Sequence, residues 1–282
     1  MKYSICGAIA VVCVTTSSAW AADLPVKAAS VAMPVINDWS GFYLGAHGGY
    51  GWGDDPLTIS NSPTALAGAA IIPGDTLTGV KSKGWLAGFQ FGYNWQYYTS
   101  WVAGFEIDLS AANIKGSAST SASTSGTDPL VGPVSRSVLD ARSDKFDMLG
   151  SGRARLGYLM TPGFLLYGTG GLAWTRFVTT TTHNQSSTFS GVTLNANSVS
   201  TAPISEFGWV AGVGGEAKIL DSNWLVRLEY LHYDFGDSFS STITSSNNVT
   251  APTTIGTSSG RLTVDAVRAG VSYKFGGPVL VR

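Results

Sequence analysis

The sequence predicts an all-β protein, namely an eight-stranded antiparallel up-and-down transmembrane β-barrel, and three observations support this prediction. Apolar residues alternate with small or polar residues at period two through most of the chain, which is the pattern of strands. Short turns and long polar connections follow one another in strict alternation, as in membrane barrels with an even number of strands. The 282 residues are 44% hydrophobic and only 12% charged, yet after the N-terminus no apolar run reaches the ~18 residues of a membrane-spanning helix.

The composition also excludes several classes of protein. The charged fraction is about half of the ~25% found in an ordinary soluble domain, and the formal net charge is -1. Because the chain offers no basic surface that could neutralise phosphates, we expect no nucleic-acid partner. The 35 glycines recur as single spacers within strands, which makes a phosphate-binding loop an unsuitable interpretation.

The N-terminus predicts export from the cytoplasm. A basic start and an apolar segment over residues 5–14 precede the small-residue motif Ala19-x-Ala21, which is the order of a secretory signal peptide spanning residues 1–21. A buried N-terminal helix is the alternative, but the Thr-Thr-Ser-Ser break before the motif favours processing. Both cysteines lie inside this segment, so the mature chain needs no disulfide or thiol chemistry.

The clearest strand pattern runs from Trp85 to Tyr97, where one parity is almost wholly aromatic and the other is small or polar. Ten residues on a strand tilted near 40° rise roughly 25 Å, which matches the apolar band of a membrane barrel. Similar alternation recurs along the chain, although the phase of the fifth strand is ambiguous. The expected strands are residues 39–52, 80–97, 101–114, 145–160, 164–179, 204–220, 224–239 and 261–275.

The connections between these strands separate two architectures. Tight turns are expected at residues 98–100, 161–163 and 221–223, whereas the other connections are long and rich in Ser, Thr, Asn and Gly. Long loops of this sort count against a compact soluble domain, so a soluble β-sandwich with the aromatic residues inside remains the alternative. In a membrane barrel, the long connections would be the outer loops, and both termini would lie in the periplasm. The expected long loops are residues 53–79, 115–144, 180–203 and 240–260.

The strand phases predict a charged lumen. An eight-stranded barrel has an interior just wide enough for side chains to fill, so charges there must pair with one another or meet a heavy desolvation cost. We therefore expect an ion-pair network that plugs the barrel, and a pore lined by the same groups is the alternative. The lumen residues are Glu106, Asp108, Asp147, Arg153, Arg155, Glu216, Lys218, Arg227, Glu229, Arg268 and Lys274.

Residues suited to catalysis are few. The histidines are His47, expected inside a strand, His183, expected in a polar loop, and His232, which shares its local run with Asp234. A catalytic pair of His232 and Asp234 at the outer rim is conceivable but has no further support. The sequence therefore predicts no enzyme, no catalytic or metal site and no cofactor, and haem capture at His183 is an alternative for the loops.

Four stretches of the sequence resemble a known family. They are residues 22–28 (ADLPVKA), 39–45 (WSGFYLG), 170–174 (GGLAW) and 267–275 (VRAGVSYKF). Together with the order of strands and loops, they make the chain similar to the outer-membrane immunogenic porin-like proteins of alphaproteobacteria, which themselves resemble the OmpA-type transmembrane domain. The resemblance implies an eight-stranded outer-membrane barrel with roles in envelope integrity, surface antigenicity and, in some members, haem binding. It implies no catalytic residues.

The C-terminus departs from this family in one respect. Such barrels usually end on an aromatic residue that the barrel assembly machinery is thought to read, and Tyr273 and Phe275 fit that signal. Here, however, residues 276–282 follow as an extension. No peptidoglycan-binding domain is recognisable in the sequence, so a wall-anchoring role is not expected.

These observations divide the chain into a signal peptide, a periplasmic N-terminal segment over residues 22–38, a barrel over residues 39–275 and the C-terminal extension. The expected protein is a structural barrel in outer-membrane lipid, with both termini in the periplasm, a role in envelope integrity and loops that act as surface antigens. The alternatives are a small diffusion porin and a protein whose loops bind haem or a host ligand.

Overall fold

The computed structural model describes residues 38–61, 76–128, 132–219, 222–238, 243–245, 253–258 and 260–276, all of them within the compact unit Val35–Leu280. The predicted cleavage motif at Ala19 and Ala21, most of the N-terminal segment and most of the C-terminal extension lie outside these residues. In the described part of the chain, no helix is long and apolar enough to cross a membrane. The strands are β1 Gly41–Asn61, β2 Thr76–Tyr97, β3 Trp101–Asp128, β4 Gly132–Thr161, β5 Phe164–Phe189, β6 Val192–Lys218, β7 Trp224–Ser238, β8 Ile243–Ser245, β9 Thr253–Ser258 and β10 Gly260–Lys274.

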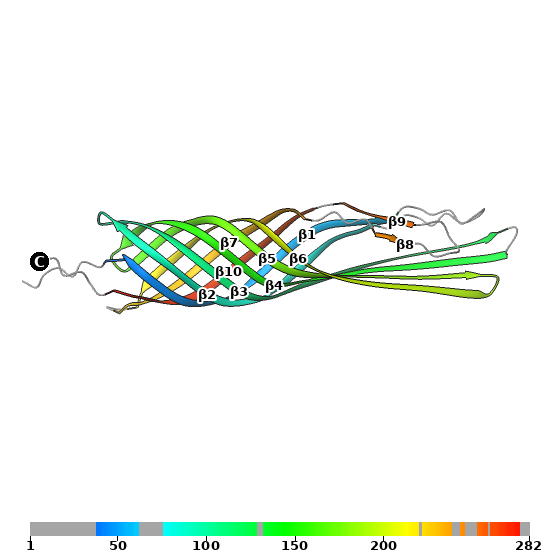
Figure 1. Cartoon of the computed structure of the whole chain (residues 1–282), viewed down its shortest axis with the longest axis horizontal. Helices are drawn as coiled ribbons and strands as arrows, with labels where there is room; N and C mark the ends of the chain where they lie inside the picture. The colour runs from blue at the N-terminus through cyan, green and yellow to red at the C-terminus, as the bar shows by residue number, and fades with distance from the viewer. Residues whose placement is uncertain are drawn as a thin grey trace, which may run out of the picture. The chain divides into compact units, whose positions relative to one another are not determined.

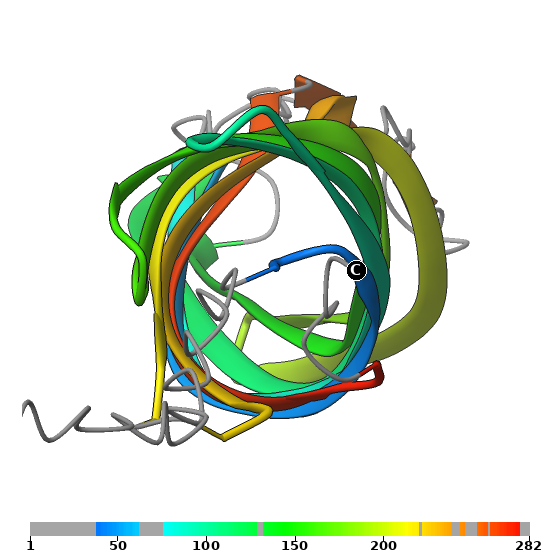
Figure 2. The same ribbon diagram turned by 90° about the vertical axis from the view of Figure 1, so that its left-hand side faces the viewer.

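Eight of these strands close into a ring, which confirms the predicted fold class. Each of β1 to β7 pairs antiparallel with the next, and β10 pairs with both β7 and β1. Figure 2 shows the resulting barrel end-on, as a closed ring of strands. The short strands β8 and β9 form no part of the ring, because β9 pairs only with the far end of β1 and with β8.

The barrel has two different ends. At one end, which we call the turn end, the connections are the tight turns at residues 98–100 and 162–163 and the short connection at 219–223, and both the start of β1 and the end of β10 lie there. At the other end, which we call the hairpin end, β3, β4, β5 and β6 run far beyond the ring (Figure 1). The predicted short turns therefore lie together at one end, but the long connections predicted for the other end are in large part extended strands.

The two faces of the barrel wall differ as the alternation predicted. Every second residue of β2 from Trp85 to Tyr97 points outward. The aromatic side chains among them are at least 46% exposed, with the exception of the half-buried Tyr93. The residues between them point into the ring and are buried or half-buried. Since the aromatic side chains lie outside a closed ring, the soluble sandwich is the wrong alternative. The ambiguous phase of β5 is also resolved, because Leu165, Tyr167, Ala173 and Phe177 point inward.

Two of the predicted long loops are wrong, and the other two, 53–79 and 240–260, are wrong in part, because β1 and β2 pair out to Ser60 opposite Thr76 and the second range contains β8 and β9. Residues 115–144 and 180–203 continue the strands as two long hairpins, with pairing from Lys115 opposite Lys145 out to Asp128 opposite Gly132 and out to Phe189 opposite Val192. Pairing between β4 and β5 joins the two hairpins. Threonine favours strands, and the Ser and Thr side chains fit a pleated surface that is polar on both faces. A two-faced polar strand lacks the apolar alternation that marks a half-buried strand.

We call the four-stranded part beyond the ring the hairpin sheet. It consists of residues 116–128 of β3, 132–144 of β4, 179–189 of β5 and 192–202 of β6. Its β5–β6 turn has Ser190 at φ 46° and Gly191 at φ 82°, and two successive positive φ values are typical of the tight turns that join antiparallel strands.

Candidate functional site

The most densely charged part of the described structure is the middle of the barrel interior. Four carboxylates and four guanidinium groups lie there, all on inward-facing positions and all no more than 5% exposed. The numbers of opposite charges are equal, which is what burial in a narrow interior requires. The residues are Glu106 and Asp108 on β3, Arg153 and Arg155 on β4, Glu216 on β6, Arg227 and Glu229 on β7, and Arg268 on β10.

The strand register explains much of this arrangement. Glu106 lies directly opposite Arg153 on the neighbouring strand, Glu216 lies opposite Arg227, and Glu229 lies opposite Arg268. Opposite charges on directly facing positions stabilise a strand pair. Strand pairing alone therefore places an acid directly opposite a base at three positions, in addition to the contacts across the lumen.

Glu106 is the centre of the contacts across the lumen. One of its oxygens accepts a hydrogen bond from Arg153, and the other accepts from Arg227 Nη1 at 2.5 Å and from the Tyr43 hydroxyl at 2.7 Å. Arg155 Nη1 and Arg268 Nη2 each lie 3.8 Å from one of the Glu106 oxygens. Strands β1, β3, β4, β7 and β10 are thus tied together through one carboxylate.

The remaining carboxylates are held in the same way. Arg268 donates to Asp108 Oδ1 at 2.9 Å and to Glu229 Oε2 at 2.8 Å. Arg153 donates to Glu229 Oε1 at 3.1 Å. Arg155 donates to Glu216 Oε2 at 2.5 Å. Each arginine therefore contacts two or more acids, and the eight groups form a connected network, which we call the interior network.

Uncharged residues that the sequence reasoning missed complete the interior network. Tyr167 donates its hydroxyl to Glu229 Oε1 at 3.0 Å, and its ring lies 4.0 Å from the guanidinium carbon of Arg155. His47 is buried between Gln90, at 2.6 Å, and Ser110, at 2.7 Å. The signal that could have found them is their parity, because they alternate with lipid-facing residues in their strands just as the charges do.

Three of the predicted lumen residues lie outside this network. Asp147 was expected in the lumen, but a register shift between Phe146 and Met148 interrupts the alternation, and its carboxylate lies 34% exposed at 2.6 Å from Lys145. Lys218 and Lys274 do point inward, but they lie near the turn end and donate to the backbone carbonyls of residues 38 and 40, at 3.4 and 2.9 Å.

Two apolar layers enclose the interior network, and the sequence analysis did not expect either of them. The layer toward the turn end contains Trp39, Val102, Leu159, Leu165, Tyr167 and Leu225. The layer toward the hairpin end contains Leu86, Ala112, Ile114, Phe146, Leu149, Ala173, Phe177, Val210, Leu231, Tyr233, Phe235, Leu262, Val264 and Ala266. Charges packed between apolar layers are shielded from water, so their mutual attraction is strong.

Trp39 fills the mouth of the barrel at the turn end. Its side chain is fully buried, its indole N–H donates to the Pro162 carbonyl at 3.1 Å, and its backbone N–H donates to Gln96 at 2.8 Å. The Lys218 ammonium lies 5.0 Å from its ring. The residues just before β1 therefore enter the interior and close it from this side.

The structure corrects the interpretation of two histidines. His183 lies within β5 and not in a loop, and its Nδ1 lies 2.5 Å from Asp140 of β4. His232 faces outward and lies 2.8 Å from Asp265. The conceivable catalytic pair with Asp234 is not formed, because Asp234 instead binds Arg261 at 2.6 Å.

The predicted assembly signal lies at the turn end. Tyr273 is outward on β10, and Phe275 directly follows this strand; both rings are exposed, with their centroids 5.3 Å apart. The backbone N–H of Phe275 donates to the carbonyl of Phe42 at 2.8 Å. These two residues therefore belong to the aromatic rim of the barrel wall.

A second candidate site is the outward face of the hairpin sheet. Nearly all of its positions carry a hydroxyl or a carboxamide, and the exceptions are Pro133, Leu139, Ala141 and Val199. The polar positions are Ser117, Ser119, Ser121, Ser123 and Ser125 on β3, Ser135, Ser137 and Ser143 on β4, Thr180, Thr182, Asn184, Ser186 and Thr188 on β5, and Thr193, Asn195, Asn197 and Thr201 on β6.

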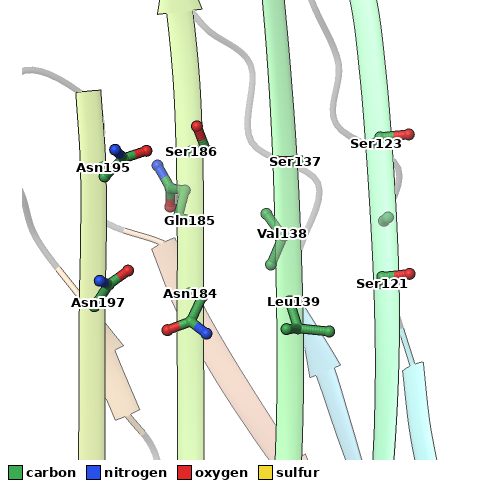
Figure 3. A pocket seen from close by; sticks show the side chains of 11 residues that line it. Ser121, Ser123, Ser137, Val138, Leu139, Asn184, Gln185, Ser186, Asn195 and Asn197 are labelled. Atoms are coloured by element: carbon green, nitrogen blue, oxygen red, sulfur yellow. The ribbon is translucent and has the colours of Figure 1, made fainter. Parts of the chain in front are cut away.

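An open groove of about 470 Å³ crosses this face. Its walls are two rows of side chains that run across all four strands, among them Ser123 and Asn195 in one row and Ser121 and Asn197 in the next (Figure 3). Its lining includes the residues between these rows on β3, β4 and β5. Such a surface offers many hydrogen-bond donors and acceptors and little charge, which suits polar, uncharged ligand groups.

Comparison with known proteins identifies the family. The model of the outer membrane protein β-barrel domain matches residues 8–275. The chain belongs to this family of outer-membrane β-barrel proteins. The 31 kDa outer-membrane immunogenic protein of Brucella melitensis is 31% identical over 252 residues, which cover 84% of this chain and 88% of the relative. The 22 kDa outer membrane protein of Rhizobium leguminosarum is 30% identical over 76% of this chain and 70% of the relative.

Solved structures with similarity to this outer-membrane barrel are more distant. The outer membrane protein OprG from Pseudomonas aeruginosa is 12% identical with a TM-score of 0.42, and the match covers 85% of this chain and 99% of OprG. Ail, the attachment invasion locus protein of Yersinia pestis, is 10% identical with a TM-score of 0.33, covering 84% and 99% of the two chains.

Proposed function

We propose that this outer-membrane barrel is a structural protein whose lumen is plugged, and that it contributes to envelope integrity and presents its hairpins as surface antigens. The observation that supports the plugged lumen is the interior network of four acids and four arginines, packed between two apolar layers. A diffusion pore needs a continuous water-filled path. Here, by contrast, side chains fill the barrel at three successive levels.

Conductance measurements separate the plugged barrel from the small diffusion porin. The refolded protein is inserted into planar lipid bilayers under an applied voltage. We expect no stable current steps, because ions would have to cross both apolar layers and break the interior network. Reproducible stepwise conductance from the wild-type protein would contradict the plugged lumen and support the porin instead.

The proposed role in envelope integrity rests on the filled interior of the barrel and on its membership of an outer-membrane β-barrel family. A strain that lacks the protein is expected to become more sensitive to bile-salt detergents and to large antibiotics that an intact outer membrane excludes. Expression of the wild-type chain should restore resistance. Unchanged sensitivity in the deletion strain would remove the envelope role while leaving the lumen plug untouched.

The antigen role rests on the hairpin sheet and on the relatives, since the Brucella melitensis relative is named an outer-membrane immunogenic protein. The sheet carries long stretches of exposed backbone and polar side chains at the hairpin end, where antibodies would reach it on intact cells. Antibodies raised against the purified barrel should label intact cells, and shortening both hairpins should abolish most of that labelling. Labelling only after permeabilisation would contradict this orientation.

Haem capture by the hairpins has less support than it had from the sequence alone. His183 is only partly exposed, and its Nδ1 is held by Asp140 in the sheet, so it is not a loop residue free to approach an iron. We expect no change in the hemin absorption spectrum on titration with the protein. A Soret shift that disappears in His183→Ala would restore the haem hypothesis.

A further inference from the structure

The outward surface of the barrel changes abruptly toward the hairpin end. On β3 the apolar positions end with Leu109 and Ala111, and Lys115 follows on the same face. On β2, Lys83 lies on the same face just beyond the exposed Trp85. Trp85 lies opposite Asn113, and Lys83 lies opposite Lys115. Two residues of a tilted strand rise roughly 5 Å, so both lysines lie about that far beyond the level of Trp85. This is the depth of the lipid headgroups.

Three lysines form a row at this level. Lys83 lies directly opposite Lys115, and Lys115 lies directly opposite Lys145, on three successive strands. All three side chains are exposed and point outward. We call these residues the basic row. Like charges on directly facing positions destabilise a sheet, so such a row is expected only where an anion compensates for the repulsion.

The acids nearby compensate only one lysine of the basic row. Asp147 lies 2.6 Å from Lys145, and Asp54 lies opposite Lys81 in the register of β1 and β2. In the described part of the structure, neither Lys83 nor Lys115 has an ion pair. Arg176 of β5, exposed and outward beside Met148, adds a further positive charge on the next strand. An anion that compensates Lys83 and Lys115 would therefore come from outside the protein.

The surface on either side of the basic row indicates which anion this is. Toward the membrane lies the apolar band, with exposed Phe89 and Leu109. Away from the membrane lies the outward face of the hairpin sheet, with its hydroxyl and carboxamide side chains and its open groove. Read along the strands, the face is apolar, then positive, then rich in neutral hydrogen-bonding groups. A phosphorylated glycolipid has acyl chains, phosphates and sugars in the same order.

We infer that the outward face of β2 to β5 is a docking surface for a phosphorylated glycolipid of the outer leaflet, with its phosphates on the basic row and its sugars against the first rows of the hairpin sheet. The apolar band supplies the contact with the acyl chains. The assignment requires the hairpin end to face the outer leaflet. It does not depend on whether the lumen is plugged, so its failure would leave that proposal standing.

The test uses the full chain in detergent micelles and bisphosphorylated lipid A as the probe. Binding is measured by titration and by native mass spectrometry, for the wild type, for K83Q with K115Q, and for K83R with K115R as the charge-matched control. Each basic residue near a lipid surface is worth about one kcal/mol, so the glutamine variant should bind roughly 10- to 30-fold more weakly. The arginine variant should bind within about threefold of the wild type.

Several results would overturn the inference. Equal binding by the glutamine variant, or equal binding of dephosphorylated lipid A by the wild type, would show that the basic row does not hold the phosphates. Equal binding of phosphatidylglycerol would show that sugars contribute nothing, and full competition by millimolar inorganic phosphate would indicate a site for free anions. Heat-modifiable migration on gels is the control that both double variants are folded, so that weaker binding is not ascribed to unfolding.

Discussion

At the scale of single residues, the stability of the interior depends on which charge each side chain faces. Glu106 accepts hydrogen bonds from Arg153, Arg227 and Tyr43, and it is only 2% exposed. Removing its charge leaves two buried guanidinium groups with fewer compensating acids. An uncompensated buried charge costs far more free energy than an intact buried pair contributes.

We therefore predict that Glu106→Gln lowers the free energy of unfolding by about 3 kcal/mol or more, measured by urea unfolding of the refolded barrel with tryptophan fluorescence. Asp147→Asn is the matched control. Its carboxylate is 34% exposed and pairs only with the exposed Lys145, and exposed pairs contribute less than about 1 kcal/mol. An equal decrease in the free energy of unfolding in the two variants would mean that the interior network contributes no more to stability than an exposed ion pair.

Glycine has a steric role at a few inward positions. A Cβ at Gly92 would collide with the hydroxyl and the ring of Tyr43 and lie 2.6 Å from the Phe105 carbonyl. Gly92 thus makes the room in which Tyr43 reaches Glu106. At Gly168, on the outward face of β5, a Cβ would meet only the Gly212 carbonyl at 3.9 Å.

We predict that Gly92→Ala destabilises the barrel by about 1 to 3 kcal/mol, because overpacking forces Tyr43 or the backbone to shift, and that Gly168→Ala is neutral within about 0.5 kcal/mol. The midpoint of the heat-modifiability transition on gels reports both effects. A neutral Gly92→Ala would show that the interior can relax around Tyr43.

The sequence predicted the inward charges because period-two alternation holds without interruption through most strands. It failed for Asp147, since the register shift beside Phe146 inverts the faces from that residue on. A single shifted residue exchanges the two faces of a strand. Little in the run from Lys145 to Met148 marks the shift, because it contains neither glycine nor proline.

At the scale of elements, the ring was predictable and the hairpin sheet was not. Within the ring, most strands have an apolar or aromatic face, so their phase is visible in the sequence, with the fifth strand as the exception. Beyond Lys115 and Lys145 both faces are polar, and such a segment reads as a loop. One local signal was available: the Ser190-Gly191 dipeptide between two Thr- and Ser-containing segments is a recognised hairpin signal, and it forms the β5–β6 turn.

We predict that the ring folds without the hairpin sheet. Residues 119–141 and 182–199 would each be replaced by Asn-Gly, which joins facing strands through a two-residue turn. The layer that contains Ile114, Phe146 and Phe177 remains intact in this variant, so it should still show heat-modifiable migration and the circular dichroism of a β-barrel. Loss of both signals would mean that the hairpin sheet is needed to form the ring.

At the scale of the whole molecule, the barrel interior is a stack of three levels: an apolar layer that includes Trp39, the interior network, and an apolar layer that includes Phe146 and Phe177. The sequence predicted only the middle level. The apolar levels are formed by residues such as Leu225 and Leu231, which occupy the otherwise polar parity of their strand. Within one strand, each such apolar residue is an isolated exception to the polar pattern of the inward face. Closure of the ring brings the apolar residues of different strands into contact.

This stack predicts how the barrel can be opened. Trp39→Ala clears the mouth at the turn end, and Phe146→Ala with Phe177→Ala thins the layer at the hairpin end, but each change leaves the interior network in place. We therefore expect neither variant to conduct in planar bilayers. A combined variant carries all three substitutions together with Arg153→Ala and Glu229→Ala. Because this pair removes one base and one acid, the interior stays neutral. The combined variant should produce discrete current steps, provided that it still migrates as a folded barrel. Conductance from Trp39→Ala alone would show that the mouth is the sole barrier, and a folded but silent combined variant would show that the remaining side chains still fill the lumen.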